Sequence, residues 1–478
     1  MGKASSRSSD AREMDQMDKS KEQILGLVGL HNLGNTCFMN TSLQCLSNSP
    51  PLVDFFYDKN WRKQLNKDNI LGHHGEVAEA FGDLMSELWE NSANIAAITS
   101  SSCSCCNPFN CLCSYKKKSK GKANANANAN IRTSTRSNAV TVTPNAFKNA
   151  IGKHNEIFMG YQQHDSQELL LFLLDALHED LNRVRKKPYV EDVEYDGKYI
   201  SYESSSSSKE KPEPIIMSEE EVAKLSWIGH LRRNQSVIVD LFQGQLKSIL
   251  QCLHCNHQSI KFEAFMNLEL PVPSNDDNNS NNSRSNSNHD DGRPKTPSHY
   301  SDTDINKCLK EFCKKELLNG DHQWRCPKCK ILRDATKQIT LHSLPNILII
   351  TFKRFQIDNY GYTCGKINIH IDFPLQGLDV TDGMGTSKDI DIDKDKDIDI
   401  DKETSNSNNN NSHSHKHDDD DDNDPHYDLY GVANHIGVMG GGHYIAYAQN
   451  SMNQQWYCYD DSHVSRKKES DICNRNAY

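Results

Sequence analysis

The chain has 478 residues, of which 36% are hydrophobic and 25% are charged. This length suits one large elaborated domain or two to three ordinary ones, and the low apolar share indicates that part of the chain lies outside any core. The net charge is −11, but the stretch 388–424 contributes −9 of it through 14 acidic residues and five lysines. The remaining residues show no excess of basic side chains of the kind that binds nucleic acid, so we expect no nucleic-acid partner.

The sequence also argues against membrane insertion and secretion. No run of 18 or more apolar residues occurs, so we expect no transmembrane segment, and the polar first 21 residues lack a secretory signal. We therefore expect a cytoplasmic and/or nuclear location, where the 16 cysteines would serve metal binding or catalysis rather than disulfides. The start Met1–Ser6 fits the loose N-myristoylation pattern, but such short matches are more often accidental than real, and we do not favour a lipid anchor.

Polar, low-complexity segments interrupt the chain, and they cannot bury enough apolar surface to offset their ordering entropy. We expect disorder in a tail and four insertions, at 1–23, about 99–136, 204–213, 274–297 and 381–424. Residues 24–478 would then form one body with long loops. The cluster from Cys103 to Cys113 falls in the first insertion; metal binding or acylation is open there, but a loop with neither role is favoured.

The patterned blocks change character along the chain. Apolar residues recur at helical spacing in Cys37–Leu46, Val77–Trp89 and Gln167–Leu181. Strand-like runs come later, at Leu246–Gln251, Ile347–Phe352, Tyr430–His435, Tyr444–Ala448 and Trp456–Tyr459. Helices first and strands later predict an α+β architecture.

The stretch around Cys37 is a candidate nucleophile. Gly34 permits a tight turn, and either Asn35 or Thr36 can cap the following helix. Cys37 then lies in the first helical turn, where free backbone N–H groups and the helix dipole favour the reactive thiolate. Asn32 could direct its amide at a developing oxyanion. The ordinary alternatives are a small buried apolar residue for Cys37 and a turn residue for Asn32.

A candidate base lies near the other end of the chain. Three glycines precede His443, which opens a strand-like run, although a surface histidine after a flexible loop is the ordinary reading. A hairpin register that sets His443 directly opposite Asp460 would let this carboxylate orient the imidazole. A slip of one residue would bring Asp461 to that face instead. His435 is the competing base, and we interpret it as structural.

Two C-x2-C pairs suggest a zinc site. They are Cys252 with Cys255 and Cys326 with Cys329, and four thiolates are a common set for tetrahedral Zn²⁺. Between the pairs lie 70 residues, against a usual gap of about 15 to 20. The alternative is four unconnected thiols, with Cys308 and Cys313 available as substitutes.

Together these motifs resemble the ubiquitin-specific proteases. The matching segments follow the family's order and cover nearly everything from Leu25 to Tyr478: Gly29–Cys45, Gly160–Glu168, the two C-x2-C pairs, Leu344–Phe355 and Tyr427–Ser465. The resemblance implies a papain-like fingers–palm–thumb fold and a thiol-dependent deubiquitinase that cleaves after the C-terminal glycine of ubiquitin. It also implies ubiquitin and ubiquitinated proteins as partners.

The resemblance assigns roles to individual residues. It makes Cys37 the nucleophile, His443 the base, Asp460 the orienting acid and Asn32 the oxyanion donor. It makes Cys252, Cys255, Cys326 and Cys329 the ligands of a structural Zn²⁺ in the fingers, with no catalytic cofactor.

The resemblance also implies a binding site for the ubiquitin tail. By themselves, Asp165 and Glu168 read as a capping box that opens the helix Gln167–Leu181. The resemblance adds that Asp165, with Glu168 beside it, contacts the arginine-bearing tail. It further implies that Gly441, Gly442 and Tyr444 line the narrow channel for the terminal Gly-Gly, although an aromatic residue at a strand start is as often core.

One departure leaves a rival function open. The family's pattern continues beyond Tyr478 through a further apolar strand, so we expect the chain to be truncated at its C-terminus. That truncation favours a non-catalytic ubiquitin-binding scaffold, whereas the intact set of Cys37, His443 and Asp460 favours an enzyme. A thiol hydrolase for a ubiquitin-like modifier is a second rival.

Overall fold

The computed structural model describes residues 25–99, 140–196, 199–202, 214–274, 300–357, 363–384, 425–438 and 441–478. The predicted tail, most of the predicted insertions, the Cys103–Cys113 cluster and the start Met1–Ser6 lie outside these residues.

Two predicted insertion boundaries are wrong. Ser274 is buried, so the folded body includes it. Thr381–Gly383 forms a short 3-10 helix, and Met384 bridges to Leu341. A Cβ on Gly383 would press against Leu309, which shows how closely this turn packs on the core. Residues 381–384 therefore belong to the folded body rather than to the fourth insertion, which we expected from about residue 381, because these apolar contacts hold the segment.

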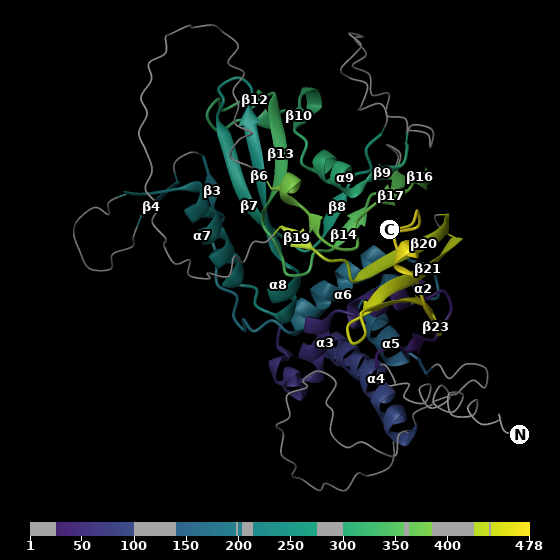
Figure 1. The fold of residues 1–478 in the computed structure, drawn as a ribbon. Coiled ribbons are helices and arrows are strands. Elements are labelled where there is room, and N and C mark those ends of the chain that lie inside the picture. Colours follow the sequence, from purple (N-terminus) through teal and green to yellow (C-terminus); the bar gives the residue numbers. More distant parts are fainter. Residues whose placement is uncertain are drawn as a thin grey trace, which may run out of the picture.

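The helices lie mainly in the N-terminal half, and α2 to α6 with α8 gather on one side of the molecule, whereas α9 lies beside the first sheet (Figure 1). They are α2 (Cys37–Ser47), α3 (Pro50–Tyr57), α4 (Glu76–Thr99), α5 (Asn145–His154), α6 (Ser166–Asp180), α7 (Glu219–Leu231), α8 (Val237–Phe242) and α9 (Ile305–Phe312). The three predicted helices are confirmed as α2, α4 and α6. Their apolar stripes form the helical core: Val77, Phe81 and Leu84 of α4, for example, are each at most 4% exposed. None of the described helices combines the length and apolarity needed to cross a bilayer.

The strands form two larger sheets and several two-stranded pairs. They are β1 (Gly29–Leu30), β2 (Thr141–Val142), β3 (Glu194–Tyr195), β4 (Tyr199–Tyr202), β5 (Pro214–Met217), β6 (Gly244–Cys252), β7 (Gln258–Phe265), β8 (Leu268–Leu270), β9 (Thr303–Asp304), β10 (Glu316–Leu318), β11 (Trp324–Arg325), β12 (Leu332–Arg333), β13 (Ala335–Ser343), β14 (Ile350–Phe352), β15 (Phe355–Ile357), β16 (Thr363–Lys366), β17 (Ile371–Asp372), β18 (Leu378–Asp379), β19 (His426–Tyr427), β20 (Gly431–Val438), β21 (Gly441–Asn450), β22 (Gln455–Asp460) and β23 (His463–Arg466). The predicted α+β class is confirmed.

The first sheet, in the order β10-β13-β6-β7-β3, rises away from the helices as long antiparallel strands (Figure 1). The second sheet is the antiparallel meander β20-β21-β22-β23, which lies beside α2. Cys37, Phe38 and Tyr444 belong to one apolar cluster, so the start of α2 and the start of β21 share a core. This packing joins the two ends of the chain.

A short parallel pair fixes the segment before α2. β1 pairs with β2, and Leu30 N donates to the carbonyl oxygen of Asp461 at 2.8 Å. A Cβ on Gly29 would collide with the backbone of Ser462, so only glycine allows the two backbones to approach this closely. The loop before Cys37 is therefore held directly against the turn after β22.

The last described residues lie along the free edge of β20. Ala477 bridges to Asn434 in antiparallel fashion, and Tyr478 N donates to Ala433 O at 2.9 Å. The buried Arg354 guanidinium donates from Nε to Ala477 O at 2.8 Å, which holds this segment from its other side.

Candidate active site

The loop before Cys37 adopts a turn that few sequences tolerate. Gly34 and Asn35 have φ values of 102° and 56°, in the left-handed region that glycine and asparagine occupy most readily. Thr36 is the N-cap residue of α2, as one of the two alternatives predicted, but its side chain makes no cap hydrogen bond. Its Oγ1 instead accepts from Leu33 N at 2.9 Å, which closes the loop.

The Asn32 side chain organises this loop from within. Its Oδ1 accepts from Gly34 N at 2.9 Å and from Thr36 N at 3.0 Å. Its Nδ2 donates to Asp461 Oδ2 at 2.9 Å. The carbonyl end of the amide therefore shapes the turn, while the nitrogen end faces the C-terminal sheet. Because an amide nitrogen carries two hydrogens, one remains to donate to a substrate oxygen.

Cys37 lies at the first position of α2 with only 3% of its surface exposed. Burial raises the pKa of the Cys37 thiol; hydrogen bonds from the backbone of Tyr444 and Phe38 lower it, and the Asp461 charge raises it again. The net effect is a raised pKa. The expected preference for thiolate at a helix start is thus outweighed, because burial and a nearby carboxylate disfavour the anion. In this structure Cys37 needs a base to become reactive.

His443 and Asp460 form the predicted pair. His443 Nε2 lies 2.7 Å from Asp460 Oδ1, and both side chains are partly exposed, at 40% and 49%. A neutral His443 that donates from Nε2 keeps its lone pair on Nδ1, the form that a general base requires. Cys37 and Tyr444, the residue after His443, pack in one apolar cluster, which places the imidazole and the sulfur on neighbouring elements, α2 and β21.

The predicted hairpin register is wrong by two residues. β21 and β22 pair Ala446 with Tyr459 and Tyr447 with Cys458, so Asp460 continues the ladder opposite Ile445 rather than His443. The cause is the turn, which is shorter than expected because β21 extends to Asn450. A shift of two preserves which side chains share a face, so Asp460 still reaches His443 diagonally.

Asp461 is a site residue that the sequence reasoning did not assign. Its φ of 49° turns the chain immediately after β22, so its carboxylate points toward the N-terminal loop. It accepts from Asn32 Nδ2 at 2.9 Å through Oδ2 and from Asn40 Nδ2 at 2.7 Å through Oδ1. The consecutive aspartates therefore divide the work: Asp460 holds the imidazole and Asp461 holds the two amides. The sequence signal that could have indicated a role for Asp461 is the pair of consecutive aspartates at the end of a strand.

Gly441 and Gly442, which precede His443, differ in whether the fold requires a glycine. A Cβ on Gly442 would collide with His435 Nε2, so the fold itself demands glycine there. A Cβ on Gly441 would meet nothing within 4 Å. The Gln163 side chain pairs with the Gly442 backbone in both directions, at 3.1 and 3.2 Å. These bonds fix the backbone that leads into His443.

His435, the competing base, is placed as the sequence predicted, in a structural position. It is 3% exposed, and its ring lies 4.5 Å from that of Tyr444. Burial and the charge of Lys366 lower the pKa of His435 to about 4. It is therefore uncharged at neutral pH and packed in the core rather than exposed to a substrate.

The predicted tail-binding residues lie around the start of α6. Asp165 is its N-cap and accepts from Gln167 N at 2.8 Å, while Glu168 is exposed. The bond from Glu168 back to the backbone of Asp165 that would complete the predicted capping box is not among those formed by the described residues. Burial raises the pKa of the Asp165 carboxyl, although a hydrogen bond from the Tyr478 hydroxyl lowers it. Tyr444 is 7% exposed, and its place in the tail channel stays a prediction.

The four predicted zinc ligands come together at one end of the first sheet. Their Sγ atoms all lie within 4.8 Å of one another, and those of Cys255 and Cys326 are 3.6 Å apart. Tetrahedral Zn²⁺ with Zn–S bonds of about 2.3 Å requires sulfur separations of about 3.8 Å, so the set fits the ion. The alternatives Cys308 and Cys313 are buried elsewhere, within α9 and at its C-cap.

Two matching turns build the cysteine cluster. Asn256 and Lys330 follow the first cysteine of each pair by four residues and have φ values of 53° and 64°. Their N–H groups donate back to the carbonyls of Cys252 and Cys326 at 2.9 and 2.8 Å. Antiparallel pairing of β6 with β13 brings the turns together despite their separation in sequence.

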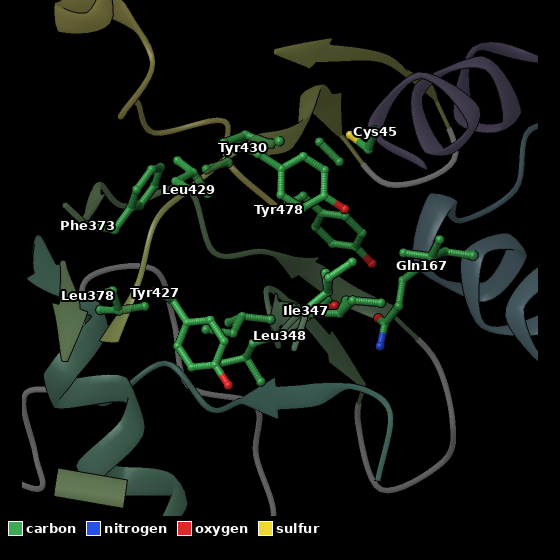
Figure 2. Close-up of a pocket in the computed structure, with 18 of the residues that line it drawn as sticks. Cys45, Gln167, Ile347, Leu348, Phe373, Leu378, Tyr427, Leu429, Tyr430 and Tyr478 are labelled. Carbon is green, nitrogen blue, oxygen red and sulfur yellow. The ribbon is translucent and has the colours of Figure 1, made fainter. Parts of the chain in front are cut away.

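An apolar cavity of about 240 Å³ is separate from Cys37, which is not among its lining residues. It lies between β14 and β20, and Figure 2 shows Cys45 at one edge, Tyr478 beside it, and Ile347, Leu348 and Tyr427 farther along the wall. Its lining carries no counterpart of the His443–Asp460 pair. The candidate chemistry therefore lies between α2 and β21, where Cys37 is buried and the His443–Asp460 pair is partly exposed.

The family model described as "Ubiquitin carboxyl-terminal hydrolase" matches residues 28–478. The chain belongs to this family. Among curated members of the ubiquitin carboxyl-terminal hydrolase family, hydrolase 2 of Rattus norvegicus is 28% identical over 465 residues, covering 97% of this chain and 54% of the rat protein. The putative hydrolase 11 of Arabidopsis thaliana is 40% identical over 254 residues, covering 53% of this chain and 21% of the plant protein. The chain thus spans between about a fifth and about half of these relatives.

Solved structures show the same fold. The SAGA DUB module containing Ubp8, Sgf11, Sus1 and Sgf73 bound to monoubiquitin matches with a TM-score of 0.54 and 20% identity, covering 98% of this chain and 72% of that chain. The same module bound to ubiquitin aldehyde matches with a TM-score of 0.53 and 19% identity, with the same coverage. The architecture of this hydrolase-family chain is therefore one already seen in a DUB module.

Proposed function

We propose that this chain is a thiol-dependent deubiquitinase that hydrolyses the isopeptide or peptide bond after the C-terminal glycine of ubiquitin. The observation that carries the proposal is that Cys37, at the start of α2, packs in one apolar cluster with Tyr444, while Asp460 holds the ring of the adjacent His443 at 2.7 Å. A nucleophile, a base and an orienting acid in this relation are the parts of an acyl-transfer site. Membership of the hydrolase family supports the same reaction.

In the proposed acylation step, His443 takes the thiol proton and the Cys37 sulfur attacks the carbonyl carbon of the terminal glycine. The tetrahedral intermediate collapses as the C–N bond breaks, and the imidazolium returns the proton to the leaving amine. Water, deprotonated by His443, then attacks the thioester and releases the ubiquitin carboxylate and the Cys37 thiol. The raised pKa of Cys37 makes the base essential, because the free thiol is not ionised at neutral pH.

The oxyanion of each intermediate would be held by donors already fixed in place. Asn32 keeps one amide hydrogen beyond its bond to Asp461, and the backbone N–H groups of Cys37 and Phe38 point from the first turn of α2. Because these donors are set before the substrate arrives, they need little reorganisation during reaction.

The tail of ubiquitin would approach across the start of α6 and the glycines before His443. Asp165 and Glu168, together with Glu269, whose Oε1 accepts from Gln167 at 2.8 Å, give this surface an acidic character that suits an arginine-bearing tail. The open space at Gly441 suits close passage of the terminal Gly-Gly. Charge on the partly buried Asp165 would then be compensated by the incoming cation.

We also propose a structural Zn²⁺ at Cys252, Cys255, Cys326 and Cys329. Four thiolates leave no position open for water, so the ion would stabilise the end of the first sheet and take no part in the chemistry.

A ubiquitin-amide reporter tests the activity. Cys37→Ala should abolish turnover while ubiquitin binding persists, and Cys45→Ala, which removes a second cysteine of the same helix, should leave turnover near the wild-type level. Asp460→Asn should lower kcat by about 10² to 10⁴ through misorientation of His443. Undiminished turnover in Cys37→Ala would exclude the proposal. Parallel reporters built on a ubiquitin-like modifier separate the two substrate classes: faster cleavage of these would reassign the substrate.

A further inference from the structure

A second group of metal-binding side chains lies outside the catalytic and four-cysteine sites. His370 and Asp372 flank Ile371 at β17, and Cys473 follows the short 3-10 helix Glu469–Asp471. Cys473 Sγ lies 3.5 Å from Asp372 Oδ1 and 4.0 Å from His370 Nε2. The histidine nitrogen and the carboxylate oxygen are themselves 4.0 Å apart. Three different donor types therefore form a nearly equilateral triangle.

The backbone holds these side chains on one side. Side chains alternate along an extended strand, so His370 and Asp372 project opposite to Ile371, which is fully buried. His370 N donates to Asp302 Oδ1 at 2.9 Å, and its carbonyl accepts from Thr303 N at 3.0 Å. On the other segment, Ile472 directly precedes Cys473 and is fully buried in the same apolar cluster as Ile371. Both ligand-bearing segments are thus fixed by core residues rather than by loop conformation.

The surroundings of Cys473 resemble those of a zinc-ligating sulfur. Phe373 N donates to Cys473 Sγ at 3.4 Å, the same distance at which Cys329 N donates to Cys326 Sγ in the four-cysteine cluster. Cys473 also lies 3.7 Å from the Ile371 carbonyl, which the protonated thiol can use as an acceptor. Once the thiol proton is lost, the sulfur can no longer donate to this carbonyl, and it can only accept from the Phe373 N–H or bind a cation.

We propose that His370, Asp372 and Cys473 form a second Zn²⁺ site, with three protein ligands and one position open to water. A tetrahedral Zn²⁺ with Zn–S of about 2.3 Å and Zn–N or Zn–O of about 2.0 Å needs donor separations of about 3.3 to 3.6 Å. The triangle reaches this by shifts of a few tenths of an ångström. One thiolate and one carboxylate neutralise the ion, and the neutral imidazole completes the set. Asp372, at 75% side-chain exposure, leaves the fourth position facing solvent.

The site calls for a residue-specific readout, because the chain has 16 cysteines and total metal uptake does not distinguish them. Alkylation of Cys473 by N-ethylmaleimide can be followed by peptide mass spectrometry of the full chain, with and without added Zn²⁺. At free Zn²⁺ about ten times the dissociation constant, alkylation of Cys473 should slow by about tenfold. Protection should strengthen as pH rises, since the ion competes with the thiol proton.

Matched variants separate this site from binding by Cys473 alone. Asp372→Asn, a change at an exposed carboxylate, and His370→Gln should each raise the Zn²⁺ concentration that half-protects Cys473 by more than about 100-fold. Asp471→Asn removes a neighbouring carboxylate outside the triangle and should keep full protection. Equal protection in Asp372→Asn and wild type, or no protection of Cys473 at millimolar Zn²⁺, would overturn the proposal. Unchanged circular dichroism of each variant keeps misfolding from being mistaken for lost ligation.

Discussion

The side-chain amide of Asn32 donates to the carboxylate of Asp461 at 2.9 Å, across 429 positions of sequence. The same carboxylate accepts from Asn40 at 2.7 Å, so one residue of the C-terminal turn fixes two amides of the N-terminal segment. This contact sets where the proposed oxyanion donor lies relative to Cys37. It also places a negative charge close enough to raise the pKa of the thiol.

Removing this carboxylate should therefore impair catalysis more than binding. Asp461→Ala frees the amide of Asn32, and loss of one oriented oxyanion donor costs about 10² to 10³ in kcat. We expect a fall of that order in kcat for a ubiquitin-amide reporter, with KM within about threefold of wild type. Steady-state kinetics of Asp461→Ala and Asn32→Ala check this. Because both changes remove the same donor, the double variant should be little worse than either alone; fully additive losses would contradict the shared role.

The raised pKa of Cys37 predicts an alkaline dependence for its reaction with a small alkylating agent. The thiolate is the reactive form, so below the pKa the rate should rise about tenfold per pH unit. Because burial moves the pKa above the ordinary value of 9.0, the rate in free protein should not level off below that pH. Rates of iodoacetamide labelling of Cys37 against pH measure this directly.

Neutralising Asp461 provides the control for this pH profile. The carboxylate charge raises the pKa of Cys37, so Asp461→Asn should shift the labelling profile toward lower pH. A plateau near pH 7 in the wild-type protein would show that the thiolate is already stabilised before substrate binds, contrary to the structure.

Zinc removal should disturb the first sheet and spare the thiol site. Chelation, or Cys252→Ser, removes the ion that would join the turns after β6 and β11, so we expect loss of about one zinc per chain and easier proteolysis within β6–β13. Cys313→Ser changes a cysteine outside the cluster and should keep the metal. Elemental analysis and limited proteolysis follow both effects; a folded, metal-free wild-type chain would argue against this site.

Much of the site could be predicted because its parts are local. The glycine-containing turn before Cys37, the helix that follows and the alternating strand after His443 each have a signal within a dozen residues. The face shared by His443 and Asp460 was also predictable, since it depends only on the parity of the hairpin register. The register itself was not, because the extension of β21 to Asn450 reflects packing that the sequence pattern does not contain.

The remaining features of the site depend on contacts between residues far apart in the sequence, which local patterns do not predict. Nothing near Asp461 in sequence announces Asn32 or Asn40, because the contact arises from the close approach of Gly29 to Ser462. The cysteine spacing gave only partial support for one metal site, since the pairs meet through strand pairing between β6 and β13. The pKa of Cys37 moved opposite to expectation because burial outweighed the helix terminus.

A buried carboxylate away from the site offers a test of the fold. Asp180 is fully buried and accepts from the backbone N–H groups of His73 at 2.6 Å, Gly75 at 3.1 Å and Ala78 at 3.1 Å. It thereby anchors the start of α4 to the end of α6. Asp180→Ala leaves these donors unpaired at about 1 to 3 kcal/mol each, so we expect at least about 3 kcal/mol of destabilisation. Denaturant unfolding measures it, and a loss below about 1 kcal/mol would contradict the contact.

Covalent capture by ubiquitin bearing a C-terminal electrophile tests the central claim most directly. The account predicts a single adduct that peptide mass spectrometry maps to the Cys37 sulfur, formed by wild type and by Cys45→Ala and greatly slowed in His443→Ala. Binding of ubiquitin without any adduct, or an adduct on a different cysteine, would contradict it.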